Sequence, residues 1–388
     1  MYSYRKEMVS EFSFSLSYIK LSFIFFNLIL GAFIPFFSFW LSIFTFALLE
    51  RKDAFLLKVN LLVFAFYSSV VYSSRAFFLT PSDDYIRYFE VYKASVLSWY
   101  DLYFSEPGLL LLYNLLNVVG LDLSVSGLAF VTSLLSTLLL SVFFYCLVRG
   151  DENIRHPGLC LSLSFAFISF DYINQLVRQS ISLTFLLLCL LPIARNKKIV
   201  CYFFAAMFHF SSIFIGGLMM CLRYHPLKSI VVLLFLFALL YFVIGHFSFL
   251  GGVAARLEYY QGGVFEFSWY IKYVLIILFS SLFLYVFGIH DKGWLYKFLL
   301  SSAFVLVVVS PLGLISLRVL LFYIAYLIGL HMYVVFERVK TLLVIIFSFV
   351  MVYKLYRLLG LGSQEDVFSL WRTYEPFSMM PFYYFLEY

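Results

Sequence analysis

Charged residues are scarce in this sequence. Of its 388 residues only 12% are Asp, Glu, Lys or Arg, whereas 64% are apolar. Soluble domains carry charge on about a quarter of their residues, so this chain cannot cover a water-facing surface. Its apolar residues form long runs, for example at 230–247, 269–288 and 342–353, and about 20 apolar residues cross a bilayer as a helix. The composition excludes a soluble globular protein and predicts an all-α, polytopic integral membrane protein.

The sequence also lacks the short motifs of several enzyme classes. It has no Gly-rich phosphate-binding loop, no His-Glu-x-x-His and no Gly-x-Ser-x-Gly, so neither ATP use nor a zinc-dependent hydrolase is supported. Its five cysteines lie in or beside apolar runs, where they pack as small hydrophobic residues rather than as a zinc site or disulfide framework. We therefore expect no cofactor and no metal.

The net charge of +6 is first a signal of membrane topology, and nucleic acid is not an expected partner. By the positive-inside rule, short basic clusters between apolar runs lie in the cytoplasm. Six such clusters occur: Arg51-Lys52 with Lys58, Arg149 with Arg155, Arg195 with Lys197-Lys198, Arg223 with Lys228, Lys292 with Lys297, and Arg338 with Lys340. The other connectors are then periplasmic: the loops 74–108, 171–178, 248–267 and 315–319, and the C-terminal segment 359–388.

Two apolar segments do not fit this arrangement as ordinary crossings. Residues 108–119 are too short for a span, so we expect a half-helix that enters the outer leaflet and returns. Residues 201–222 must fold as two half-helices that meet near His209 if the later basic loops are to stay inside. Irregular backbone at that depth needs cover from protein or water, which predicts a cavity open to the periplasm. With these re-entrant segments, residues 1–388 form one membrane domain of about 12 transmembrane helices.

Arginines are unexpectedly frequent on the predicted periplasmic side, at Arg75, Arg178, Arg256 and Arg318. A single arginine at the end of a span often reaches the lipid headgroups. Four of them on the face that the positive-inside rule disfavours indicate a phosphate-bearing ligand, because guanidinium groups bind phosphate in a bidentate manner. A lipid-linked diphosphate is the obvious membrane-borne candidate. Further candidates for substrate contact are Gln179, Tyr88 and Tyr260.

Three residues are candidate proton acceptors. His209 lies at the expected helix break, where a neutral imidazole can take a proton from a sugar hydroxyl; the alternative is a core histidine bonded to a carbonyl. Glu106 directly precedes Pro107 and Gly108 at the start of a half-helix. It is either a base, a hydrogen-bond acceptor for sugar, or a favourable charge near a helix N-terminus. Asp84 is either a third candidate or a solvated loop acid.

The order of these residues resembles that of the EpsG-like branch of the Wzy (O-antigen polymerase) family. The matching elements are Arg75, Asp84 with Tyr88, Glu106-Pro107-Gly108, Arg178-Gln179 leading to Lys197-Lys198, Phe208-His209-Phe210-Ser211, and Arg318. They cover roughly residues 55–330. The chain has Thr80-Pro81-Ser82 where the family commonly has a glycine, so the aspartate of the family pattern is either Asp83 or Asp84.

The resemblance implies a lipid-dependent (GT-C-like) glycosyltransferase of the bacterial inner membrane. It would polymerise undecaprenyl-diphosphate-linked oligosaccharide units at the periplasmic face, for O-antigen or a related surface polysaccharide, and release undecaprenyl diphosphate. The arginines would stabilise the leaving diphosphate without a metal, with His209 as first and Glu106 as second choice of base. The sequence identifies neither the sugars nor their linkage, and it leaves open whether a chain-length regulator protein is a partner.

Other functions remain as alternatives. An O-antigen ligase would use the same donor, but ligases generally carry one large periplasmic loop, and here the longest internal one is residues 74–108. A polysaccharide flippase or other transporter would place ionisable residues near the middle of its spans, where this sequence has almost no acids. A membrane acyltransferase would also use His and Arg, but the order of the motifs fits it less well.

Overall fold

The computed structural model describes residues 2–73, 84–94, 106–168, 176–225, 293–309 and 323–358, together with 173, 228, 231–232, 235, 275, 277–279 and 281–282. Over these residues the chain is helical and contains no strand, as the sequence predicts. The helices are α1 (Tyr2–Phe33), α2 (Pro35–Leu48), α3 (Ala54–Ser73), α4 (Asp84–Ala94), α6 (Pro107–Val118), α7 (Val125–Gly150), α8 (Pro157–Phe167), α10 (Val177–Cys189), α11 (Arg195–Phe208), α12 (Ser211–Tyr224), α16 (Trp294–Val309), the π-helical turn η3 (Tyr323–Leu327), α18 (Ile328–Phe336) and α19 (Lys340–Leu358).

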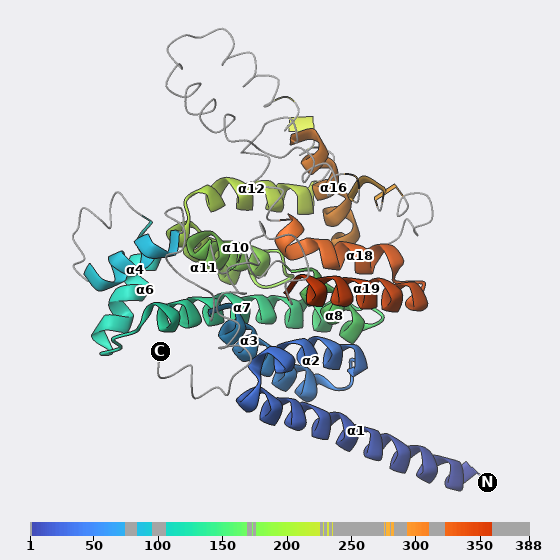
Figure 1. The fold of residues 1–388 in the computed structure, drawn as a ribbon. Coiled ribbons are helices and arrows are strands. Elements are labelled where there is room, and N and C mark those ends of the chain that lie inside the picture. The colour runs from blue at the N-terminus through green and yellow to red at the C-terminus, as the bar shows by residue number, and fades with distance from the viewer. Residues whose placement is uncertain are drawn as a thin grey trace.

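Helices α3 and α7 form an antiparallel pair at the centre of the molecule (Figure 1). Arg51, just before α3, donates to the carbonyl of Asp151, just after α7, at 2.8 Å. Late in α3, the ring of Phe66 lies 5.6 Å from that of Phe130, early in α7. With 20 and 26 residues, the two helices are about 30 and 39 Å long. In the part of the chain that the structure describes, they alone are long and apolar enough to cross a membrane.

The number of crossings stays a prediction. Eight shorter apolar helices of 10–17 residues accompany α3 and α7 among the residues described. Most of the expected spans at 230–247 and 269–288 lie outside the described residues, as does the segment 359–388.

The surface of the bundle is apolar. Large hydrophobic side chains point outward from several helices, with exposed fractions of 70% for Phe55, 60% for Leu62 and 73% for Phe349. Soluble monomers do not expose apolar area on this scale. Such a surface is the one expected of a membrane protein, in which lipid covers the outer side chains.

Inside the bundle, polar side chains form hydrogen bonds between the first three helices. The amide of Asn27 on α1 donates to the hydroxyl of Ser42 on α2 at 2.8 Å, and the amide of Asn60 on α3 donates to the Ser42 carbonyl at 2.9 Å. All three residues are fully buried. Interhelical hydrogen bonds of this kind hold helices together where lipid removes the hydrophobic driving force between them.

Three of the predicted cytoplasmic basic clusters meet at one end of the α3–α7 pair, namely those at 51–52, 149–155 and 338–340. The loop after α7 is tied to α18 there: Glu337 accepts from the backbone N–H of Arg155 at 2.9 Å. These three clusters therefore lie at the same end of the bundle, and the side of the membrane that this end faces stays a prediction.

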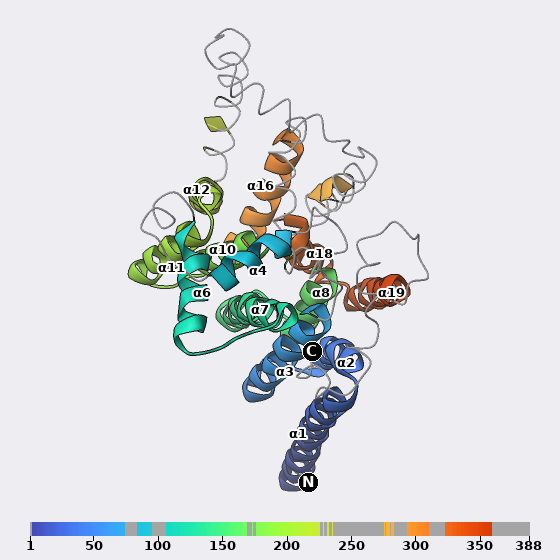
Figure 2. The ribbon, with the colours of Figure 1, turned by 60° about the vertical axis from the view of Figure 1, so that its left-hand side comes forward.

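The opposite end carries α4 and α6, packed beside the start of α7 (Figures 1 and 2). The Tyr85 hydroxyl on α4 lies 2.8 Å from the Thr132 hydroxyl on α7. Helix α6 coincides with the predicted half-helix. Pro107 occupies its first turn, where a missing N–H costs nothing, and Gly120 follows its end with a φ of 80°, the left-handed conformation that glycine adopts without strain. The predicted break near His209 is also present, between α11 and α12.

Candidate functional site

A close approach of two helices builds the candidate site. Gly108, in the first turn of α6, faces the end of α11. A Cβ at this position would lie 2.9 Å from the Phe208 ring and 3.0 Å from the Met207 carbonyl carbon. Only glycine therefore allows the start of α6 to lie this close to the backbone of α11. The approach brings Glu106, the residue before α6, to the break between α11 and α12.

At the break, Glu106 contacts His209. The histidine Nδ1 lies 2.5 Å from the carboxylate Oε1, and the backbone N–H of Phe210 donates to the same oxygen at 3.2 Å. His209 ends α11 in an extended backbone conformation, so the broken helix supplies both a side chain and a main-chain donor. A carboxylate oxygen only accepts hydrogen bonds, so Nδ1 carries the hydrogen and Nε2 is the proton-accepting nitrogen of the neutral ring.

The second carboxylate oxygen pairs with Arg178. Its Nη1 lies 2.7 Å from Glu106 Oε2, and its Nε donates to the Tyr88 hydroxyl at 3.3 Å. The guanidinium lies over the Tyr88 ring, 5.5 Å from the centroid, a cation–π arrangement. Glu106 thus joins α6, α10 and the α11–α12 break, while Arg178 extends the cluster to α4. We call Glu106, His209, Arg178 and Tyr88 the Glu106 cluster.

Burial differs within the Glu106 cluster. The side chains of Glu106 and His209 are 12% and 15% exposed, whereas that of Arg178 is 43% exposed. Among the described residues, His209 Nε2 is buried and has no hydrogen-bond partner. The arrangement presents a guanidinium toward the outside, with an oriented imidazole behind it.

Glu106 is ionised in this setting. Burial raises the pKa of its carboxyl, but the contacts with His209, with the Arg178 guanidinium and with the backbone N–H of Phe210 outweigh burial, and the pKa lies below the ordinary 4.5. With a lowered pKa and both oxygens engaged, Glu106 is a weak base. Chemically, the cluster supplies one fixed carboxylate, one guanidinium and one imidazole whose Nε2 is suited to accept a proton.

A family model described as the EpsG family matches residues 59–370. That range covers most of the 388 residues and contains every member of the Glu106 cluster. The chain belongs to the EpsG family. No curated protein and no solved structure matches it. The resemblance identified from the sequence is confirmed, and membership of this family indicates a polysaccharide polymerase-like role.

Three elements that carry the EpsG-family resemblance are brought together by the fold. They are Glu106-Pro107-Gly108, Arg178-Gln179 and Phe208-His209-Phe210-Ser211, which are separated by some 70 and 30 residues in sequence. Their residues have distinct parts. Gly108 permits the close approach of α6 to α11, and the Glu106 carboxylate contacts both Arg178 and His209. The order of motifs in this EpsG-family chain thus corresponds to one contiguous cluster.

The remaining predicted site residues either lie apart from the Glu106 cluster or are not among the residues that the structure describes. Gln179 is half-buried on α10, and no hydrogen bond joins it to the cluster. Asp84 begins α4, but its side chain lies outside the described residues, as do Arg75, Arg256, Arg318 and Tyr260. Of the four predicted periplasmic arginines, the structure therefore describes Arg178 alone. Within the same described ranges no group of three or more His, Cys, Asp or Glu side chains could hold a metal ion.

The sequence predicted Tyr88 as a candidate contact but not the layer of tyrosines on which it lies. Tyr85, Tyr88 and Tyr92 form one buried face of α4, and Tyr113 of α6 packs on it, with its ring 5.6 Å from that of Tyr92. The signal was present, because spacings of three and four residues place side chains on the same face of a helix. This EpsG-family chain therefore seats Tyr88 on a rigid aromatic layer, which fixes the ring against which Arg178 stacks.

Proposed function

We propose that this EpsG-family chain polymerises undecaprenyl-diphosphate-linked oligosaccharide repeat units at the periplasmic face of the bacterial inner membrane, for O-antigen or a related surface polysaccharide. The observation that carries the proposal is the Glu106 cluster, which joins a guanidinium and an oriented imidazole through one carboxylate. Glycosyl transfer from a lipid diphosphate to a hydroxyl requires two such groups. One stabilises the charge on the leaving diphosphate, and the other accepts the proton of the hydroxyl.

The position of the cluster supports the periplasmic side. Tyr88 and Tyr85 lie on α4, which contacts the first third of α7 through Thr132, whereas Arg51 contacts its last residues. Between Thr132 and Arg149 the helix rises about 26 Å, close to the thickness of the hydrocarbon core. If the basic end faces the cytoplasm, as the positive-inside rule requires, the Glu106 cluster faces the periplasm.

In the proposed reaction a terminal sugar hydroxyl of one lipid-linked unit attacks the anomeric carbon of the growing chain. His209 Nε2 accepts the hydroxyl proton as the new carbon–oxygen bond forms. The bond between the anomeric carbon and the diphosphate oxygen breaks, and undecaprenyl diphosphate leaves with the electron pair. Arg178 stabilises the charge on the departing diphosphate. Glu106 holds the Nδ1–H and stabilises the imidazolium, so we assign it a positioning role ahead of the role of base.

Further substrate contacts are proposed for the other predicted residues. Tyr88 offers a fixed ring edge beside Arg178 for a sugar. We propose that Arg75, Arg256 and Arg318 bind the second diphosphate or anionic sugars, with Gln179 and Tyr260 as hydrogen-bonding or stacking partners, and that Asp84 is an alternative proton acceptor. A lipid-dependent glycosyltransferase of the GT-C-like class that works in this way needs no metal, because arginine neutralises the phosphates.

The test is deletion of the gene in its native strain, with surface glycans resolved by gel. The strain is complemented with wild type, with Arg178→Ala, and with Lys93→Ala as the control. Lys93 is a cation at the same end of the molecule that pairs with Asp122 rather than with the cluster. We expect single repeat units instead of a ladder after deletion, and restoration by wild type and Lys93→Ala but not by Arg178→Ala at equal membrane levels.

Each other outcome contradicts a stated part of the proposal. An unchanged ladder after deletion would overturn the polysaccharide function. Free polymer that stays on its lipid carrier would indicate a ligase, and single lipid-linked units held on the cytoplasmic face would indicate a flippase. A full ladder with Arg178→Ala would remove Arg178 from the site.

A further inference from the structure

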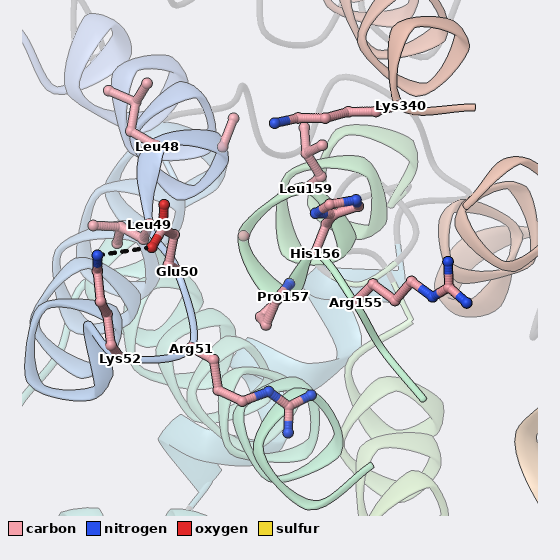
Figure 3. Close-up of a pocket in the computed structure, with 12 residues that line it drawn as sticks. Leu48, Leu49, Glu50, Arg51, Lys52, Arg155, His156, Pro157, Leu159 and Lys340 are labelled. Carbon is pink, nitrogen blue, oxygen red and sulfur yellow. Dashed lines mark ion pairs between the residues drawn. The ribbon is translucent and has the colours of Figure 1, made fainter. Parts of the chain in front are cut away.

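A second site lies at the basic end of the bundle, away from the Glu106 cluster. There a cavity of about 440 Å³ opens between three segments: the end of α2 with its following turn, the start of α8, and the start of α19 (Figure 3). Its lining includes four cationic residues, namely Arg51, Lys52, Arg155 and Lys340, against the single acid Glu50. Such an excess of positive charge around one concave space attracts an anion.

The cations differ in how they are engaged. Arg51 is committed to the fold, because its guanidinium donates to the carbonyls of Asp151 and Ile154 at 2.8 Å. Lys52 forms an exposed pair with Glu50 at 3.1 Å. The Lys340 ammonium extends over the cavity (Figure 3) and has neither an ion pair nor a hydrogen bond with any described residue. Lys340 and Lys52 are therefore two side chains that can approach a ligand, whereas that of Arg51 cannot.

Two helix N-termini add to this positive potential. Helix α8 starts at Pro157 and α19 starts at Lys340, and both starting residues line the cavity. No side chain caps the start of α8. Uncapped N–H groups and the helix dipole together favour phosphate groups at such a position.

The apolar part of the lining indicates where the rest of the ligand lies. Leu48, at the rim of the cavity, is 55% exposed, and one turn before it Phe44 is 41% exposed. On α19, Val344 lies one turn beyond Lys340 and is 42% exposed. The Phe44 ring contacts that of Phe347, with centroids 5.2 Å apart, so α2 and α19 are neighbours along this strip. An exposed apolar strip thus leads away from the cations along both helices.

We infer that this cavity binds the phosphate headgroup of an anionic membrane lipid, with the acyl chains lying along the α2–α19 strip. Phosphate suits the two lysines and two helix N-termini. A lipid suits the apolar strip better than free phosphate does, because free phosphate would leave the strip unused. Basic pockets between helices at the cytoplasmic side are where anionic lipid headgroups are bound. This inference is independent of the glycosyl-transfer proposal and concerns the opposite end of the molecule.

The experiment measures lipid binding to the purified full chain in neutral detergent. Phosphatidylglycerol is titrated and bound lipid is counted by native mass spectrometry, with phosphatidylcholine and inorganic phosphate as separate probes. The double variant Lys52→Gln/Lys340→Gln is compared with wild type and with Lys58→Gln. Lys58 is a matched exposed lysine at the same end that lies outside the cavity, over the Tyr145 ring.

We expect the double variant to bind phosphatidylglycerol about 25-fold more weakly, since each lysine near an anionic headgroup contributes about a five-fold factor. Lys58→Gln and the charge-preserving Lys52→Arg/Lys340→Arg should bind as wild type does. Equal binding of phosphatidylglycerol by wild type and the double variant would overturn the site. Equal affinity for phosphatidylcholine would overturn the assignment to an anionic lipid. So would full displacement of phosphatidylglycerol by an equal concentration of inorganic phosphate.

Discussion

The two ends of the α3–α7 pair use charge in different ways. At the end with the Glu106 cluster, the acid and the cations satisfy one another: Glu106 takes both His209 and Arg178. At the basic end the pairing is incomplete: Glu50 pairs with Lys52, and Glu337 accepts from the Arg155 N–H and the Tyr333 hydroxyl. The Lys340 ammonium is left to a ligand. Mutual pairing fixes the geometry of side chains, whereas unpaired cations attract an anion without orienting it.

This difference separates chemistry from binding. A group-transfer site needs reacting groups held to within a fraction of an ångström, which the bridged carboxylate provides. A site for a lipid headgroup needs mainly a positive electrostatic potential and a cavity of suitable shape. The following predictions test whether the ends are distinct in this way, and they run from the largest expected effect to the smallest.

The largest effect is expected for His209→Ala. Loss of the proton acceptor should slow polymerisation of purified lipid-linked repeat units by about 100-fold or more, measured as the rate at which the gel ladder forms in detergent. The control is His156→Ala, a histidine that lines the basic cavity at the other end, for which we expect the wild-type rate. Equal rates for the two variants would show that the Glu106 cluster has no special role in the reaction.

A smaller, cooperative effect is expected for Glu106 and Arg178. Each of Glu106→Gln and Arg178→Ala should slow polymerisation, but the double variant should be less impaired than the product of the two single effects. Residues in direct ion pairs show coupling of about 0.5–3 kcal/mol. The measurement is a double-mutant cycle on the polymerisation rate. Strict additivity would mean that the 2.7 Å contact between the two side chains does not operate during the reaction.

The smallest effect concerns pH. The pKa of the Glu106 carboxyl is lowered below 4.5, so ionised Glu106 stabilises the folded chain at every pH above that ordinary value. The contribution is lost as the pH falls through the lowered pKa. We expect wild type to unfold a few degrees above Glu106→Gln at neutral pH, with the difference retained down to about pH 4.5 and shrinking below it.

Thermal unfolding in detergent across buffers of different pH checks this expectation, with Glu90→Gln as the control. Glu90 is an exposed acid on α4, and its variant should match wild type throughout. A wild-type advantage that appears only in acid would have the wrong sign for a lowered pKa.

The sequence predicted local features of the site well because they depend on nearby residues. Pro107 and Gly108 mark the start of α6 irrespective of tertiary contacts. The helix break near His209 followed instead from the positions of the basic loops on either side of residues 201–222. The Glu106–His209 contact was not predicted. The two residues are 103 positions apart, and their contact depends on how closely α6 approaches α11, which hydropathy does not report.

The count of membrane crossings was the least accessible property for a related reason. Hydropathy measures the free energy of moving a segment into lipid, but a short helix buried among other helices and a short helix facing lipid have similar compositions. Helices such as α8, with 11 residues, are too short to span as straight rods yet are almost wholly buried. Whether such helices cross depends on neighbours that a single segment does not specify.

The position of the Glu106 cluster within the chain has a consequence for biosynthesis. All the residues that form it lie between 88 and 210, and the segments that hold them end with α12 at residue 224. Since a membrane chain is inserted from its N-terminus as it is translated, the cluster can assemble while the last third of the protein is still unmade. The basic cavity cannot, because it waits for Lys340. The catalytic candidate is thus complete on the nascent chain well before the lipid-binding candidate exists.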